Sequence, residues 1–87
     1  MESSKYEPIS DELKKVKKAG SLRVTFSFQQ IEDILGQSLP MSARKYRPWW
    51  ANNYSQKSRH CQAWLSQNWE TESIDFHQER VTFVCVQ

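Results

Sequence analysis

The chain has 87 residues, and its twelve basic and ten acidic side chains give a formal net charge of +2. This length predicts a single domain over residues 1–87, and the near balance of charge does not by itself indicate a partner. No run approaches the ~20 apolar residues of a membrane-spanning helix, and the polar start MESSKYEP is unlike a signal peptide, so we expect a cytoplasmic protein without a membrane partner.

Cysteine and histidine are too few to indicate a disulfide framework or a metal centre. Cys61 and Cys85 form no CxxC pair, and two cysteines in an ordinary composition are not a framework. A structural metal site needs about four ligands at usable spacing. We therefore expect reduced thiols, no metal site and no cofactor.

The start of the chain predicts an amphipathic helix followed by a short strand. The helix covers residues 8–19, because Pro8 suits the first helical turn and Gly20 is a typical C-terminal stop. Residues 22–26, LRVTF, alternate between apolar and polar, which is typical of a half-buried strand. The residues predicted to face the core are Ile9, Leu13, Val16, Leu22, Val24 and Phe26.

A second helix is predicted to begin at Ser27 and to end at Gly36. Ser27 and Gln30 fit a capping box, in which each side chain bonds the other residue's free backbone N–H. The following segment, residues 37–57, is irregular, with one or two helical turns expected from Pro40.

The last third predicts a helix over residues 58–67 and a hairpin of strands 70–76 and 81–86. Asn68 is suited to the left-handed backbone that ends a helix. This order, helix–strand–helix–irregular segment–helix–two-stranded hairpin, predicts an α+β fold of the winged-helix type, a helix-turn-helix variant, with a three-stranded antiparallel sheet. In such a fold the third helix is the candidate recognition helix. The side chains assigned to the core here are Cys61, Trp64, Leu65 and Trp69.

The middle of the chain is basic and aromatic. From Gln37 to Trp69 there is no Asp or Glu, and basic residues interleaved with aromatics and amides indicate a nucleic-acid-binding face. Solvated helix surface, or turn chemistry for the asparagines, is the structural alternative. The residues predicted to contact nucleic acid, above all double-stranded DNA, are Arg44, Lys45, Arg47, Asn52, Asn53, Lys57, Arg59 and Gln62.

The adjacent Trp49 and Trp50 allow several interpretations. Arg47 precedes Pro48, which favours an extended backbone at Arg47, and neighbouring side chains of an extended segment point to opposite sides. We therefore expect one indole to be buried and the other to lie nearer solvent. Both can be mainly structural. Otherwise the outer one stacks on an unpaired base or anchors a protein partner.

At SARKYRPWWAN, residues 42–52, the chain resembles a family of short uncharacterised bacterial domains. The family pattern has a core of the form L-P-x-S-A-R-x-x-R-x-W-W-A-N, a later A-W-L helix and a terminal hairpin, and the chain matches it over nearly its whole length. The resemblance implies no activity. It marks this motif as the signature of the family, and the motif can serve either the fold or a functional site. One departure is Asn68, where the pattern has Gly.

Two functions follow from these observations. The first is a small DNA-binding protein that uses the basic face of residues 42–62. The alternative is a protein-interaction module, such as a subunit, adaptor or inhibitor, that docks through the same Arg/Trp surface or the sheet edge. Since the chain has only two glycines and no metal cluster, we expect no enzyme, no catalytic residue and no small-molecule substrate.

The direction of two guanidinium groups distinguishes these functions. If Arg44 and Arg47 share an open face with the third helix, a polyanion is favoured. If they stack on Trp49 or Trp50 and pair with Glu32, Asp33 or Asp75, the segment is a structural latch.

Overall fold

Three strands form one antiparallel sheet in the order β1–β3–β2. The computed structural model describes residues 5–55 and 60–86. The strands are β1 (Arg23–Ser27), β2 (Trp69–Asp75) and β3 (Arg80–Cys85). β3 is central, and it pairs with β2 through a hairpin and with β1 across the chain. The predicted α+β class with a three-stranded antiparallel sheet is confirmed, and the hairpin strands begin and end one residue earlier than predicted.

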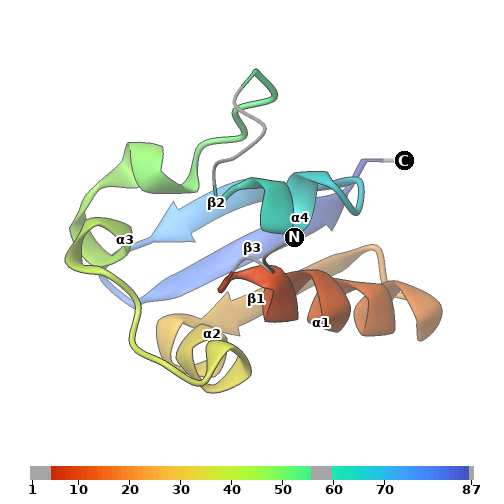
Figure 1. The fold of residues 1–87 in the computed structure, drawn as a ribbon, viewed down its shortest axis with the longest axis horizontal. Coiled ribbons are helices and arrows are strands. Elements are labelled where there is room, and N and C mark those ends of the chain that lie inside the picture. Colours follow the sequence, from red (N-terminus) through yellow and green to blue (C-terminus); the bar gives the residue numbers. More distant parts are fainter. Residues whose placement is uncertain (1–4, 56–59, 87) are drawn as a thin grey trace.

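Within residues 5–55 and 60–86, three helices pack on one face of this sheet (Figure 1). They are α1 (Glu7–Lys18), α2 (Phe28–Leu35) and α4 (Gln62–Leu65). Ser10 of α1 donates its hydroxyl to the carbonyl of Ala63 in α4 at 2.5 Å, which joins the two helices at their buried faces. None of the helices in the described part of the chain has the length and apolar content needed to cross a bilayer.

The described part of the chain between α2 and α4 contains two short helical segments at the end of the sheet where β2 finishes (Figure 1). They are α3 (Met41–Lys45) and the 3₁₀ helix η1 (Arg47–Trp50). α3 begins after Pro40, as predicted, and buries Ala43 against the core. This connection includes the whole signature segment, residues 39–52, which carries the L-P-x-S-A-R-x-x-R-x-W-W-A-N core.

A row of stacked aromatic rings forms the centre of the core. Phe28 of α2 stacks on Trp50 at 5.7 Å, and Trp50 stacks on Trp64 at 5.9 Å. Trp64 in turn lies 5.5 Å from Phe83 of β3. Such pairs contribute about 0.5–1.5 kcal/mol each beyond burial of area, so the row joins α2, η1, α4 and β3 through specific contacts.

The helix boundaries follow the local signals. The capping box of Ser27 and Gln30 is present, and Gly36 ends α2 with a φ of 74°. Asn68 has a φ of 65°, which is the left-handed conformation predicted for it.

Leu22 is a correction to the predicted core. It is 58% exposed, because β1 begins one residue later and Leu22 lies at the end of the sheet, where its side chain has few neighbours. Its carbonyl still accepts the amide N–H of Cys85 at 2.8 Å. The alternating pattern therefore identified the strand but extended the buried face one residue too far.

The third helix is shorter than predicted over the residues that are described. α4 is the single turn Gln62–Leu65, preceded by a turn at His60 and Cys61. Residues 58 and 59 of the predicted helix lie outside the described residues. Cys61, Trp64 and Leu65 are buried, as predicted, but a winged helix with a recognition helix stays a prediction.

Candidate functional site

Arg44 of α3 lies in an ion-pair network within the protein. Its Nη2 is 2.6 Å from Oε2 of Glu32 on α2, and its Nη1 is 3.2 Å from Oε2 of Glu79 in the β2–β3 turn. The guanidinium also lies 5.9 Å from the centre of the Phe28 ring. Arg44 therefore makes the ion pair with Glu32 expected of a structural latch, but its ring contact is with Phe28 and not with a tryptophan. The two ion pairs join α3 to α2 and to the β2–β3 hairpin.

The environment of Glu32 keeps its carboxylate ionised. The amide N–H of Leu39 donates to Oε2 at 2.7 Å, and this bond, followed by the one from Arg44, lowers the pKa of Glu32 below its ordinary value. The same hydrogen bond to Glu32 raises the pKa of Arg44. Both groups are therefore charged at neutral pH and hold α3 against α2.

Trp49 and Trp50 are both buried, with 8% and 1% of their surfaces exposed. The expected extended backbone is not found, because Arg47 begins a 3₁₀ helix while Tyr46 is the extended residue. Neighbours on a helix with about three residues per turn do not point to opposite sides, so both indoles can face inward. The prediction of one outward indole is wrong.

Each indole has an internal partner. Trp49 stacks on His60 with ring centres 3.8 Å apart, and Nε1 of Trp50 donates to the carbonyl of Ala43 at 2.7 Å. In this conformation neither ring is placed to stack on a base or to insert into a partner. The two tryptophans instead hold the connection against the core.

Asn52 joins three elements through its side-chain amide. Its Oδ1 accepts from Nε1 of Trp64 at 3.0 Å and from the amide N–H of Thr71 at 2.9 Å. Its Nδ2 donates to the carbonyl of Thr71 at 3.0 Å. Asn52 therefore bonds the outer edge of β2 as a neighbouring strand would, and its predicted base-contacting amide is used within the fold.

The other predicted contact residues are dispersed. Asn53 accepts from the amide N–H and the hydroxyl of Ser55, which is the turn chemistry considered as its alternative. Gln62 is half-buried at the start of α4. Lys57 and Arg59 lie outside the described residues. Among the described members of the predicted set, only Lys45 and Arg47 are exposed to solvent.

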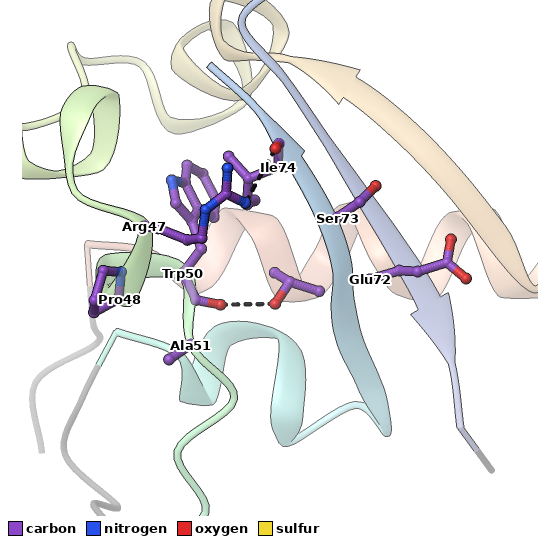
Figure 2. A pocket seen from close by; sticks show the side chains of 8 residues that line it. Arg47, Pro48, Trp50, Ala51, Glu72, Ser73 and Ile74 are labelled. Carbon is purple, nitrogen blue, oxygen red and sulfur yellow. Dashed lines mark hydrogen bonds between the residues drawn. The ribbon is translucent and has the colours of Figure 1, made fainter.

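Arg47 lies beside a pocket at the outer edge of β2 (Figure 2). The pocket has a volume of about 380 Å³. Nη1 of Arg47 donates to the carbonyl of Ile74 at 3.2 Å, and the guanidinium lies 5.2 Å from the centre of the Phe76 ring. The lining residues are Arg47, Pro48, Trp50, Ala51, Thr71, Glu72, Ser73 and Ile74.

The register of β2 shifts at this pocket. Thr71 pairs with Phe83 but Ser73 pairs with Thr82, so Glu72 is an extra residue in β2. A bulge of this kind bends a strand and re-aims its side chains. The side chains of Glu72 and Ser73 point away from the pocket (Figure 2), and Glu72 pairs with Arg23 at 2.6 Å.

A family model described as Domain of unknown function (DUF7662) matches residues 6–85. The chain belongs to this family. No curated protein and no solved structure matches the chain. The match includes every helix and strand described above and all the residues of the pocket, so the expectation of a short, uncharacterised domain family is confirmed.

In this DUF7662 domain, sequence reasoning found Arg47 but missed its surroundings. Thr71 and Ile74 form the pocket wall because β2 is an edge strand with a bulge, and no residue type in W-E-T-E-S-I-D signals a bulge. The exposed Tyr46, 61% accessible, was also not singled out. Its position directly before the Arg-Pro pair is the signal that could have identified it.

Proposed function

We propose that the protein is a protein-interaction module that binds its partner through the Arg47 face. This face is defined as Tyr46, Arg47, Pro48 and the adjoining pocket. The observation that carries the proposal is the pocket itself, where an exposed arginine without an acidic partner among the described residues adjoins an apolar cavity.

The composition of this face supports protein binding. Tyr46 is exposed beside Arg47 in the chain. Tyrosine and arginine are enriched at protein interfaces, and arginine and aromatic residues are the common anchors of binding energy. The internal use of Arg44, by contrast, removes a charge from the predicted polyanion-binding face.

The test is affinity capture from cells of the native host, followed by titration of the purified partner. Arg47→Glu reverses the charge of the proposed face, and Lys14→Glu makes the same change of charge on α1, which does not line the pocket. We expect Arg47→Glu to weaken binding at least ~10-fold, about 1.4 kcal/mol, and Lys14→Glu to leave it unchanged. Equal affinity of the two variants would reject the Arg47 face.

Binding of double-stranded DNA is a second candidate. It is supported by the absence of acids from Gln37 to Trp69 and by the exposure of Lys45 and Arg47. Because Arg44 is paired with Glu32 and Glu79, four basic residues of that segment remain, and log K should fall with log salt at a slope of roughly −3 to −4. Titration of a duplex at two salt concentrations measures the slope, and no binding at low salt would exclude this candidate.

We further propose a cytoplasmic location for either function. It is supported by Cys61 and Cys85, which are both free thiols, because disulfides are the common state of paired cysteines in oxidising compartments.

A further inference from the structure

The pocket beside Arg47 has a mainly apolar wall. Pro48, Ala51 and Ile74 contribute aliphatic surface, and Trp50, whose side chain is almost fully buried, also lines the pocket (Figure 2). Since Nε1 of Trp50 is bonded to the carbonyl of Ala43, the indole has no free donor to offer to the pocket. At about 380 Å³ the pocket lies near the lower end of the range of ligand sites, roughly 300–1,000 Å³. Such a volume suits one bulky side chain.

The polar groups of the lining are already satisfied or directed elsewhere. The hydroxyl of Thr71 donates to the carbonyl of Trp50 at 2.7 Å, and Arg23 pairs with the carboxylate of Glu72. The side chain of Ser73 points away from the pocket (Figure 2). An apolar group entering the pocket therefore does not bury an unpaired side-chain group of Thr71, Glu72 or Ser73, and such unpaired groups are the main cost of burial.

Arg47 lines the pocket and has no acidic partner within the described part of the chain. Its guanidinium is held by the bond to Ile74 and by the ring of Phe76, so little conformational freedom is lost when it binds a further group. Arginine has five N–H donors, and one is used in the bond to Ile74. A carboxylate can accept two of the others side by side, which is the strongest geometry for this pair.

Addition of a whole strand to β2 does not fit this edge. Asn52 already bonds both the N–H and the carbonyl of Thr71, and Arg47 bonds the carbonyl of Ile74. A peptide that bound by strand addition would need these backbone groups. The pocket is therefore a site for a side chain.

We propose that this pocket recognises an acidic peptide segment of the partner protein. One bulky apolar side chain of that segment fills the pocket, and a carboxylate on a neighbouring residue pairs with Arg47. This inference rests on the proposed function and names the chemistry of the partner at the same face.

Two matched peptides test it against the full chain. N-acetyl-Gly-Phe-Asp-Gly-amide carries both features, and the Asn analogue lacks only the charge. In amide and arginine side-chain NMR spectra we expect the Asp peptide to cause saturable shifts at Ala51, Ile74 and Arg47, with the Asn peptide at least ~10-fold weaker. Arg47→Met should bring the two peptides to the same weak affinity.

A second variant tests the apolar half of the site. Ala51→Leu narrows the pocket without changing charge, and we expect it to weaken the Asp peptide at least ~10-fold. Both variants must retain the dispersed amide spectrum of the native fold. Equal affinity of the wild-type protein for the two peptides, or no shift at the pocket residues at ~10 mM peptide, overturns the inference.

Comparison with affinity capture separates this inference from the function on which it depends. If a captured partner requires Arg47 but neither peptide binds, the protein-interaction function stands and recognition of an acidic segment is rejected. If no partner requires Arg47 and neither peptide binds, both are rejected. Shifts at Arg47 caused by a short DNA duplex but by neither peptide assign the face to nucleic acid, and they also overturn the inference.

Discussion

Replacing Asn52 with alanine is expected to lower the free energy of unfolding by about 2–4 kcal/mol. The change removes the amide that bonds Nε1 of Trp64 and both backbone groups of Thr71. Trp64 is fully buried, so its N–H would lose its partner without gaining water.

The magnitude follows from the surroundings of each lost bond. An unsatisfied buried donor such as Nε1 of Trp64 costs about 1–3 kcal/mol. Thr71 is half-buried on an edge strand, where water can replace part of what is lost, so its two bonds contribute about 0.5 kcal/mol each. The sum is far above the cost of an ordinary surface substitution, about 0.5 kcal/mol or less.

Urea unfolding followed by tryptophan fluorescence measures this change, and Asn53→Ala is the matched control. Among the described residues the side chain of Asn53 bonds only Ser55, in an exposed turn, so its loss should cost less than about 1 kcal/mol. Two results would contradict a structural role for Asn52: a free energy of unfolding of Asn52→Ala within about 0.5 kcal/mol of the wild-type value, or a loss no larger than that of Asn53→Ala. In either case the prediction that Asn52 contacts nucleic acid would again be the better explanation.

Two other predictions concern the latch and the end of α4. Because the folded pKa of Glu32 lies below its ordinary value of 4.5, its stabilising effect is complete above that pH and is lost as pH falls through the folded value. Glu32→Gln should therefore lower the free energy of unfolding at pH 7 and have a smaller effect at pH 3, and a difference that stays constant between these two pH values would show that the ionised carboxylate is not what stabilises. Asn68 has a φ of 65°, so Asn68→Gly should leave the free energy of unfolding unchanged or raise it slightly, whereas Asn68→Ala should lower it by about 1 kcal/mol. Thermal unfolding measures both variants, and equal stability of the two would contradict a strained backbone at this position.

The local features of this protein were determined by its sequence alone. The capping box of Ser27 and Gln30, the left-handed Gly36 and Asn68, and the two hairpin strands all follow from residues within about four positions of one another. These signals depend on backbone geometry and on hydrogen bonds made inside a single element, so they need no knowledge of the rest of the fold. The boundaries of α2, β2 and β3 were accordingly predicted within about one residue.

Only the tertiary structure decided which residues of the signature segment are structural and which are available to a partner. Arg44 pairs with Glu79, 35 positions away, and Asn52 bonds Thr71, 19 positions away; no local pattern specifies such partners. Arg47 has no acidic partner among the described residues, and the side chain of Glu72 points away from the pocket (Figure 2). In a small domain the partner of each polar side chain depends on which groups the fold brings beside it. Composition therefore identified the basic segment, while packing placed Arg47 beside the pocket.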